Sequence, residues 1–586
     1  MKFKNNRLTN NILWGNSKYC CLFFLCLILG FSSSYGKVWT YSVPGGGRLS
    51  SNDYEVTVLS EGETKNSFVY FSEGFHNYTR LNENGSVSTT RKSNHKGPAC
   101  HSHSIFSFDG PVTVRVTVKP GAKHISLPLK SARILPSSYN IPCTIENGNT
   151  IVFTLDRPEK VAVIPNYDEV WAKFVEMGEG HVPIQTWDVD YDEELKRETY
   201  KASKLSDALE EGFKNPLIIS ALPPETRVPD TNKRKTLWVN PGEKYHEDQL
   251  LEYDVVWFKP GIHDWSDVGY APFFQTRIKR GQTVYLEGGA YVMARFKRYH
   301  DKEAGPTSIV GRGVVSGIKH MWIHSFSQAS QLINIDTISG VTITDRAAFS
   351  IYNSRFIEDV TLLGAWHGNN DGPDYSDNCL IQNCFFLSHD DNLKINHNTH
   401  ARHIVIWQAT NAHAIMVKET YRSDSVMANS IVEDVDVITY FQDPNQRKED
   451  WARLGMGAIA CVTAVPYTIR NFTFKDIRIE SPYLYRIFDV YNLNTSEVNP
   501  GWFMPTTDES HSRIDGMHFE NITVTTPVIA YRSLLGSGHD DAVKDLTFKN
   551  ININGTWVTE KNKDQFFEIQ KNQINGLSFT NDLTGK

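Results

Sequence analysis

The second half of the chain repeats, with variations, the stretch Asp545-Leu-Thr-Phe-Lys-Asn-Ile-Asn-Ile553. The variants are Asn471-Phe-Thr-Phe-Lys-Asp-Ile-Arg-Ile479, Gly516-Met-His-Phe-Glu-Asn-Ile-Thr-Val524 and Asn575-Gly-Leu-Ser-Phe-Thr-Asn581. Each unit is a short strand with β-branched residues, next to a polar corner that often carries Asn. One such unit cannot bury its apolar side alone, whereas stacked copies form a continuous core.

The spacing of these units indicates which repeat architecture they build. Their central Phe residues are 45, 29 and 31 residues apart, and earlier apolar units step by 19, 20 and 24 residues from Val341 to Val360, Leu380 and Ile404. Such steps, with long insertions, predict a right-handed parallel β-helix, which we place at residues 237–586. The leucine-rich-repeat frame and the regular Trp-Asp or Gly-His signals of a propeller are missing.

Residues 37–220 follow a different pattern, in which apolar and polar residues alternate in short runs broken by Gly, Pro, Asn and Ser. Residues 112–118 and 150–155 are examples. This pattern predicts an antiparallel β-sandwich, with one amphipathic helix near residues 192–213. The polar, Pro-containing segment 221–236 is the predicted linker. The expected fold is therefore all-β, with a sandwich followed by a β-helix.

Residues 1–36 have the pattern of a signal peptide cleaved near Gly36. An apolar run of thirteen residues, 19–31, follows four basic residues, Lys2, Lys4, Arg7 and Lys18. This run is too short to cross roughly 30 Å of hydrocarbon as a helix, and no later run reaches the ~18 apolar residues of a membrane span. We therefore predict a soluble, secreted protein with no membrane contact after cleavage.

Composition excludes several classes of function. The chain has 60 basic and 67 acidic residues, and its formal net charge of −7 becomes −11 without the signal peptide. No basic surface for nucleic acid is implied. Hydrophobic (40%) and charged (22%) contents are ordinary, which excludes disordered and coiled-coil classes. We expect no cofactor, and a capped solenoid with a covering domain predicts a monomer.

Cysteines and glycosylation sequons fit an exported protein. Five cysteines follow the signal peptide; Cys100–Cys143 is the candidate disulfide, and Cys379–Cys384 is the alternative. A zinc site is not expected, because Cys379 and Cys384 have no second Cys/His pair at ligand spacing. Six candidate N-glycosylation sites are present, at Asn77, Asn84, Asn471, Asn494, Asn521 and Asn554.

The densest polar cluster lies in two neighbouring units, residues 366–375 and 388–394. Asp371 and Asp390 are 19 residues apart, about one coil, so stacking predicts Cα atoms roughly 4.8 Å apart. Asp391 follows directly. Three carboxylates in one strip repel each other, which raises at least one pKa toward that of a general acid. Hydrolysis of a glycosidic bond needs one protonated and one ionised carboxyl group.

Two other interpretations apply to the same residues. Each Asp can bind the turn backbone at a polar corner of the β-helix. Clustered Asp and Asn oxygens also suit calcium. Lys394 in the same cluster opposes a cation, so we predict no metal. Two carboxylate groups one coil apart, together with nearby aromatic and His residues, favour a catalytic site.

Three motifs resemble glycoside hydrolase family 49, the dextranases and isopullulanase. They are Asn370-Asp-Gly372, His389-Asp-Asp-Asn-Leu-Lys394 and Ile404-Val-Ile-Trp407. Upstream, Pro260-Gly-Ile262, Val284-Tyr-Leu-Glu-Gly-Gly-Ala-Tyr-Val292 and Gly311-Arg-Gly-Val-Val-Ser-Gly317 are also similar to that family. So is a sandwich placed before a β-helix. Family 28 polygalacturonases share a related Asp pattern, but their Gly-His-Gly motif is absent here.

The resemblance implies an inverting endo-hydrolase of α-1,6-linked glucan (dextran). By position, Asp390 is the general acid, while Asp371 and Asp391 position and deprotonate the attacking water. Inversion needs carboxyl groups roughly 6.5–9.5 Å apart, and retention about 5–5.5 Å. Lys394 is expected to bind a carboxylate or a sugar hydroxyl. The expected substrate-binding residues are Trp366, His367, Asn370, Tyr375, His389 and Lys394.

A local bend is a structural requirement of this assignment. Strict alternation from the inward-facing Leu393 and Ile395 would bury Asp391, so a bend or bulge must precede them if both Asp residues face a cleft. Candidate stacking platforms for sugar rings are Trp366, Tyr375, Trp407 and Trp451, with Trp366 the best of them because it borders the Asp cluster.

The chain departs from the family after Trp407, where Lys418 and Glu419 replace part of the expected sugar-lining surface. This departure leaves linkage and substrate size open. Hydrolysis of another polysaccharide, pullulan-like or polygalacturonate-like, is therefore the alternative within enzymes. A non-catalytic β-helix that binds glycans is the alternative from another class, and the presence of all three Asp residues disfavours it.

Overall fold

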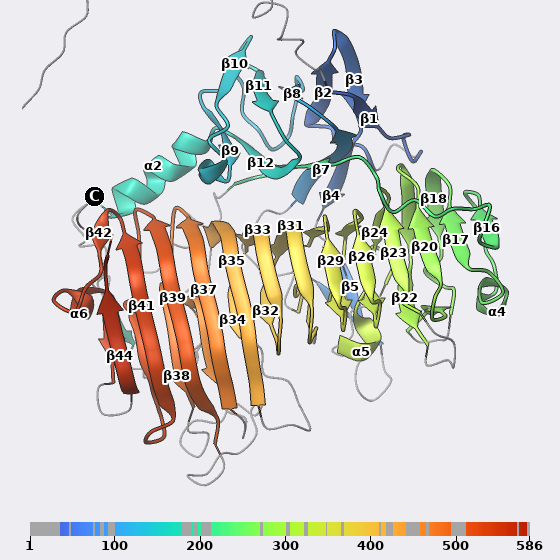
Figure 1. The fold of residues 1–586 in the computed structure, drawn as a ribbon. Coiled ribbons are helices and arrows are strands. Elements are labelled where there is room, and N and C mark those ends of the chain that lie inside the picture. Colours follow the sequence, from blue (N-terminus) through green and yellow to red (C-terminus); the bar gives the residue numbers. More distant parts are fainter. Residues whose placement is uncertain are drawn as a thin grey trace, which may run out of the picture.

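The computed structural model consists of a β-sandwich lying along one side of a parallel β-helix (Figure 1). The fold class predicted from the sequence is confirmed. The structure describes residues 36–45, 49–73, 77–81, 87–91, 100–178, 189–192, 197–200, 213–269, 273–299, 305–320, 326–346, 348–364, 369–374, 376–409, 412–417, 426–440, 457–463, 468–493, 511–570 and 574–582.

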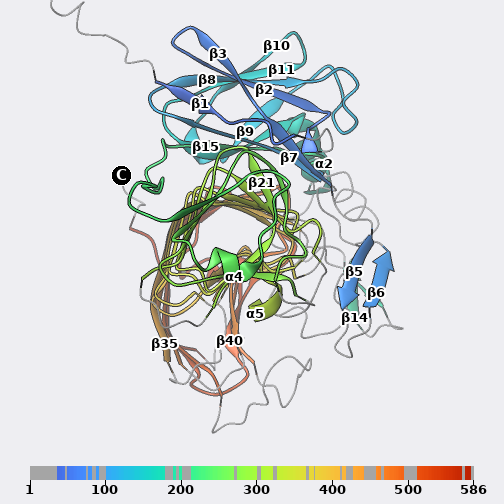
Figure 2. The same cartoon turned by 90° about the vertical axis from the view of Figure 1, so that its right-hand side faces the viewer.

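The sandwich packs two sheets face to face (Figure 2). The six-stranded sheet contains β1 (Val38–Thr40), β4 (Val69–Glu73), β7 (Cys100–Phe108), β9 (Ala132–Leu135), β12 (Glu159–Pro165) and β15 (Leu217–Leu222). The five-stranded sheet contains β2 (Tyr54–Ser60), β3 (Glu63–Ser67), β8 (Val112–Val118), β10 (Cys143–Glu146) and β11 (Thr150–Leu155). In β8 the four Val side chains are buried and the residues between them are half-buried, the period of two that a sheet with one covered face requires.

Two features of this region differ from the predicted one. β15 pairs with β7 in parallel, so the sandwich is not purely antiparallel. β13 (Val189–Asp192) and β14 (Arg197–Tyr200) form a hairpin where a helix was expected to begin, and the rest of that expected helix lies outside the described residues. Among the described residues of this region, the α-helix is α2 (Tyr167–Gly178), which buries Tyr167 and Phe174. A second hairpin joins β5 (Asn77–Leu81) and β6 (Val87–Arg91).

The β-helix is built on one nineteen-stranded sheet. Its strands are β16 (Thr236–Val239), β17 (Val255–Phe258), β18 (Gly261–Asp264), β20 (Thr283–Leu286), β21 (Ala290–Met293), β23 (Ser308–Gly311), β24 (Val314–Ser316), β26 (Thr337–Ser339), β27 (Thr342–Thr344), β29 (Phe356–Glu358), β30 (Thr361–Leu363), β31 (Leu380–Ser388), β33 (His400–Gln408), β35 (Val426–Tyr440), β37 (Thr468–Glu480), β39 (Arg513–Thr525), β41 (Val543–Ile553), β42 (Thr556–Trp557) and β44 (Ile574–Thr580). The chain passes from β15 to β16 through residues 223–235, within the predicted linker.

Two further parallel sheets complete the coils. The four-stranded sheet contains β19 (Gln275–Ile278), β22 (Arg295–Arg298), β25 (Leu332–Ile333) and β28 (Ile351–Tyr352). The six-stranded sheet contains β32 (Leu393–Ile395), β34 (Ile415–Val417), β36 (Gly457–Thr463), β38 (Arg486–Asn492), β40 (Ser533–Ser537) and β43 (Phe567–Ile569). The short helices of this part are α4 (Glu247–Leu250), α5 (Phe326–Ala329) and α6 (Lys563–Phe566).

The repeats read from the sequence stack in register. Phe474, Phe519, Phe548 and Phe579 are strand partners on successive coils, with ring centroids 4.8–5.1 Å apart and nearly parallel planes. One predicted alignment was wrong. Thr361 pairs with Phe385, so the coil after Val360 continues at Cys384 and not at Leu380. Strand β31 is longer than the strands before it and pairs with two of them, β29 and β30. An alignment of the repeats by spacing alone therefore matched Val360 with the wrong part of β31.

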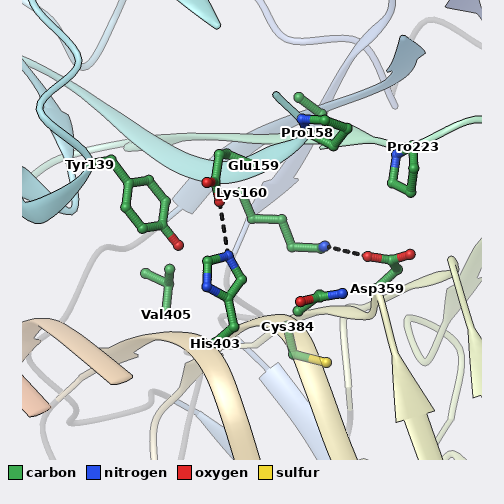
Figure 3. A pocket seen from close by; sticks show the side chains of 11 residues that line it. Tyr139, Pro158, Glu159, Lys160, Pro223, Asp359, Cys384, His403 and Val405 are labelled. Carbon is green, nitrogen blue, oxygen red and sulfur yellow. Dashed lines mark hydrogen bonds and ion pairs between the residues drawn. The ribbon is translucent and has the colours of Figure 1, made fainter. Parts of the chain in front are cut away.

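Polar contacts hold the sandwich against the β-helix (Figure 3). Glu159 Oε2, on β12, lies 3.1 Å from His403 Nε2, and Lys160 Nζ lies 3.3 Å from Asp359 Oδ1. Nearby, Ser138 donates to Asp436 at 2.8 Å. Glu159, Lys160, Asp359 and His403 line a cavity of about 120 Å³, which also borders Cys384. The two parts are therefore joined by charge pairs as well as by apolar packing.

The disulfide prediction is wrong. Cys143 is a free thiol at the start of β10, in the five-stranded sheet, whereas Cys100 begins β7 in the other sheet, opposite Glu73. The alternative bridge is also not formed, because Cys379 and Cys384 are free, buried thiols separated by extended chain along β31.

Several other sequence predictions concern the surface or the chain start. Asn471, Asn521 and Asn554 are exposed and have left-handed backbone angles, and Asn77 begins β5. Asn84, Asn494 and nearly all of the predicted signal peptide lie outside the described residues, so glycosylation and cleavage stay predictions. Among the helices that the structure describes, none is both long and apolar enough to cross a membrane.

Candidate functional site

The predicted site lies where the four-stranded sheet gives way to the six-stranded sheet. Tyr352 of β28 makes a single parallel bridge to Asp374, and the regular ladder resumes only at β32, one coil further on. The segment that contains Asp371 and Asp374 therefore replaces a strand. Its backbone is joined to the next coil by the Gly372 N–H, which donates to the carbonyl of Asp391 at 2.8 Å.

Gly372 permits this close approach of two coils. A Cβ atom at position 372 would overlap the carbonyl oxygen of Asn392. Asn392 in turn is buried and donates from its side-chain amide to the carbonyl oxygens of Phe386 (3.3 Å) and Trp407 (3.0 Å). The Asn-Asp-Gly and Asp-Asp-Asn motifs thus lock two adjacent corners together.

The bend required by the sequence argument is present. The extended chain of β31 ends at Ser388, His389 and Asp390 form a bend, and β32 begins at Leu393. Because the chain turns here, Asp390 and Asp391 are both half-buried, while Leu393 remains in the apolar core. Asp390 accepts hydrogen bonds from the Asn369 N–H (2.8 Å) and the Asp391 N–H (2.9 Å).

The three predicted Asp residues come together. One carboxylate oxygen from each of Asp371, Asp390 and Asp391 lies within 4.8 Å of the other two. Asp371 is the deepest, at 3% exposure, and the other two are more open. Asp374, which the sequence argument did not select, is also buried beside them. We call these four residues the carboxylate cluster.

Lys394 is the cation of the carboxylate cluster. Its side chain is completely buried, and its ammonium group contacts Asp371, lies 3.0 Å from Asp374 and lies 3.9 Å from Asp391. The predicted contact between Lys394 and a carboxylate is therefore present. A fully covered lysine can hold these groups in place, but it does not reach a ligand directly.

One ammonium group faces several carboxylates, so the cluster retains a proton. Burial raises the pKa of Asp371 to about 8; contact with Lys394 acts in the opposite direction, and the charges of Asp390 and Asp391 add to the increase. Although burial disfavours a charged lysine, Asp371 and Asp374 hold the pKa of Lys394 well above its usual range. The ammonium form of Lys394 is thus stable, and the proton that titrates near neutral pH belongs to the carboxylates as a group.

The other predicted site residues divide into two sets. Asn370 and His389 are completely buried, so neither faces a ligand. Asn370 instead donates to the carbonyl oxygens of Arg346 (3.0 Å) and Ala348 (3.1 Å), and its predicted substrate contact is replaced by a structural one. Trp366, His367 and Tyr375, with Trp451 among the candidate platforms, lie outside the described residues.

Trp407 is not a stacking platform. Its side chain is completely buried and packs edge-on against Phe213, with centroids 5.8 Å apart. Phe213 lies four residues before the start of β15, on the sandwich side of the chain. A covered ring cannot accept a sugar, so the aromatic prediction fails at this position for lack of exposure.

Two residues of the site, Asp374 and Arg346, were not predicted from the sequence. Asp374 lies 20 residues before Lys394, about one coil, and this spacing could have identified it. Arg346 is completely buried and contacts the carbonyl oxygen of Asp371. Nothing in the sequence near Arg346 separates it from an exposed corner residue.

The oxygens of Asp371, Asp390 and Asp391 are close enough together to serve as ligands of a hard cation. Lys394 already supplies a positive charge to two of these residues, at Asp371 and Asp391. The donor set is therefore suited to holding and moving a proton, which one ammonium and several carboxylates can do without a metal ion.

Comparisons with known proteins point to one group of enzymes. Isopullulanase of Aspergillus niger is 24% identical over 376 residues, 59% of this chain and 62% of that enzyme. Dextranase of Arthrobacter sp. (strain CB-8) is 25% identical over 322 residues, 47% of this chain and 48% of that enzyme. This chain thus spans between about half and three fifths of the length of these relatives. No family model matches the chain.

The fold comparison covers nearly the whole molecule. Dex49A from Penicillium minioluteum matches 92% of this chain and 96% of its own, with a TM-score of 0.66 and 18% sequence identity. This likeness extends over the sandwich and the β-helix together. The sequence relatives and this shared fold confirm the resemblance read from the motifs: the chain is similar to the dextranases and isopullulanase of glycoside hydrolase family 49.

Proposed function

We propose that this protein is an exported glycoside hydrolase that cleaves α-linked glucan, with α-1,6-linked dextran as its substrate. The observation that carries the proposal is the convergence of Asp371, Asp390 and Asp391 from two adjacent coils around the buried Lys394. The relatives named isopullulanase and dextranase support the same class of substrate.

In the proposed reaction, Asp390 donates a proton to the glycosidic oxygen as the bond from that oxygen to the anomeric carbon breaks. A water molecule attacks the anomeric carbon from the opposite face, and Asp371 or Asp391 takes up its proton. Lys394 touches both of these residues, so its charge favours their ionised forms. Because burial raises the pKa of Asp371 to about 8, the carboxylate cluster retains one proton near neutral pH, and in the proposed reaction this shared proton is carried by Asp390 when the substrate binds, which leaves Asp371 and Asp391 ionised.

The stereochemistry is the finer part of the proposal. The closest oxygens of the three residues lie within 4.8 Å, whereas inversion by two carboxyl groups calls for roughly 6.5–9.5 Å. Spacing alone therefore favours retention. We propose inversion because the resemblance to family 49 implies it, and because Asp371 is buried against Lys394, where it could not reach the anomeric carbon as a retaining nucleophile must. Proton NMR of the first product anomer decides between the two outcomes.

Release of reducing ends from dextran, pullulan and polygalacturonate tests the substrate. Wild-type protein is compared with Asp390→Asn, whose side chain has nearly the same size but carries no acidic proton. Dextran cleavage that is lost in the variant supports the proposal. Cleavage of pullulan alone would move the specificity toward that of the isopullulanase relative. No release from any of the three by folded protein would overturn the proposal and favour glycan binding without catalysis.

Three further properties accompany the proposed function. We propose that the chain is secreted after removal of residues 1–36, that it acts as a monomer, and that it needs no metal ion. Activity that survives extensive dialysis against EDTA supports the last statement. Activity that is lost and then restored by calcium would contradict it.

A further inference from the structure

Arg346 links the two coils that carry the carboxylate cluster. It follows β27 and is completely buried. One end of its guanidinium group contacts the carbonyl oxygen of Asp371. The other donates to the carbonyl oxygen of Leu387 at 3.3 Å and to the hydroxyl of Ser388 at 3.2 Å. A planar group with several donors can hold two backbones at a fixed separation in this way.

The contacts of Arg346 lie next to the reacting groups. Leu387 and Ser388 are the last residues of β31, directly before the bend that presents Asp390 and Asp391. The other contact is the backbone of Asp371 itself. Through these hydrogen bonds Arg346 bridges the backbone of Asp371 to the start of the segment that carries Asp390 and Asp391.

The Arg346 side chain is closely packed by Asn370 and Gly364. Asn370 donates to the Arg346 carbonyl at 3.0 Å, so the loop that carries Asp371 is tied to Arg346 through backbone and side chain. Gly364 lies against both residues. A Cβ atom at position 364 would lie 2.8 Å from Nε and from Nη2 of Arg346 and would overlap Oδ1 of Asn370.

The residue before Arg346 is held by the sandwich. Asp345 has a left-handed φ of 51°, which is unfavourable for a residue with a side chain unless its surroundings impose it. Its carboxyl group accepts hydrogen bonds from Tyr291 (2.8 Å) and Ser316 (3.0 Å) of the β-helix. It also contacts the hydroxyl of Ser72, which belongs to β4 of the sandwich.

We propose that Asp345 and Arg346 form a positioning device through which the docked sandwich fixes the separation of the carboxylates. Arg346 is a positioning residue, because it acts through the backbones of Asp371, Leu387 and Ser388. The proposal rests on the proposed hydrolase function for its kinetic readout. It assigns the sandwich a direct part in the site, in addition to covering the β-helix.

Arg346→Met, Arg346→Lys and a matched control test the device. The control is Arg295→Met, because Arg295 of β22 is also a completely buried arginine but lies outside the cluster contacts. For Arg346→Met we expect kcat on the best substrate to fall about 10²-fold with little change in KM, the effect of a small displacement of reacting groups. Arg346→Lys keeps the charge but not the several donors, so it should lose part of this rate. Equal losses of kcat in Arg346→Met and Arg295→Met would overturn the proposal.

Structures of the variants separate this proposal from the proposed function. In Arg346→Lys we expect a changed distance between the carboxyl groups of Asp371 and Asp390, and in Arg295→Lys an unchanged one. This readout needs no substrate, so it holds even if the wild-type protein cleaves none of the polysaccharides tested. An unchanged distance in Arg346→Lys would overturn the positioning role.

Ser72→Ala tests the contribution of the sandwich. The substitution removes one hydroxyl from a covered contact, and its effect on folding should be small. We expect a reduced kcat, an unchanged KM and a shift of the Asp345–Arg346 backbone. Wild-type kcat together with an unmoved backbone would show that the sandwich does not act through this contact.

Discussion

Two groups of acidic residues in this protein differ in how their charge is balanced. The interface cluster, between β-helix and sandwich, contains Glu159, Asp434 and Asp436 with His403 and Arg478. Arg478 binds Asp434 and Asp436 at 2.6 Å, and His403 lies 2.9 Å from Asp434 and 3.1 Å from Glu159. Each of these acids therefore has a basic partner within hydrogen-bond distance.

The pKa values of the interface cluster follow from this balance. The hydrogen bond from His403 lowers the pKa of Asp434 to about 2, and the same contact, with that to Glu159, raises the pKa of His403 to about 9. The pairs of His403 with Asp434 and with Glu159, whose pKa is lowered despite its burial by hydrogen bonds from His403 and Arg157, are therefore ionised near neutral pH. Such a cluster holds two parts of a protein together and has no proton to exchange.

The carboxylate cluster has the opposite composition. Three carboxylates, those of Asp371, Asp374 and Asp391, lie near the single ammonium of Lys394, and Asp390 lies beside Asp371 and Asp391. Burial raises the pKa of Asp371 to about 8. Here a proton stays in place because ionising every carboxyl group would cost too much. The comparison teaches that acid clusters in one protein acquire structural or chemical roles through the number of cations beside them.

Asp390→Asn should have the largest effect. Loss of a general acid lowers the rate about 10²–10⁴-fold, and we expect such a loss in reducing-end release from dextran. The matched change in the interface cluster is Asp434→Asn, which should lower the melting temperature and leave the rate nearly unchanged. Equal activity in Asp390→Asn and wild type would remove Asp390 from the mechanism.

Lys394→Met should destabilise the protein strongly. Removing one partner of a buried ion pair costs about 3–5 kcal/mol, because the other charge stays buried. Urea unfolding at neutral pH should show this decrease in the free energy of unfolding. The deficit should shrink in mild acid, where the carboxylates take up protons. A decrease in the free energy of unfolding that does not depend on pH would indicate that packing was lost, and not that a charge was left unpaired.

His403→Gln should weaken the interface only over a defined pH range. Because the pKa of His403 rises from 6.5 to about 9 on folding, its contribution to stability is complete below pH 6.5 and disappears as the pH rises through 9. The difference in melting temperature between wild type and variant should therefore be largest near pH 6 and close to zero at pH 10. A difference that stays constant over this range would contradict the ionic role.

Arg157→Ala should have the smallest effect. Arg157 binds Glu159 at 2.6 Å, but its side chain is 72% exposed. Exposed ion pairs contribute about 0–1 kcal/mol, so unfolding in urea should change by no more than this, and activity should not change. A loss comparable with that of Lys394→Met would mean that Glu159 depends on Arg157 rather than on His403.

Much of the fold could be predicted because its pattern is local and periodic. The Phe residues of successive repeats become neighbours across the strands, as for Phe519 and Phe548, and this needs only the sequence spacing. Cys100 and Cys143 could not be assigned in the same way. Their separation depends on which sheet of the sandwich receives each strand, and alternation within a strand carries no such information.

At the site, the sequence identifies the carboxylates but not their surroundings. Asp371 and Asp390 share a face because one coil separates them. Trp407 and Arg346 are buried by contacts with distant parts of the chain, Phe213 for the first and the neighbouring coils for the second. A tryptophan and an arginine beside acidic residues suggest an open binding surface until the covering segment is known.

The placement of the carboxylates on two adjacent coils has a consequence for how such a protein can change over evolutionary time. The smallest functional unit is a pair of coils, joined at Gly372 and Asn392, and not a single repeat. Gain or loss of a whole coil elsewhere in the solenoid would lengthen or shorten the molecule and leave this pair intact. A coil inserted between Asp371 and Asp390 would separate them by a further strand spacing of about 4.8 Å and end their cooperation. Length is therefore free to vary, whereas the junction between these two coils is not.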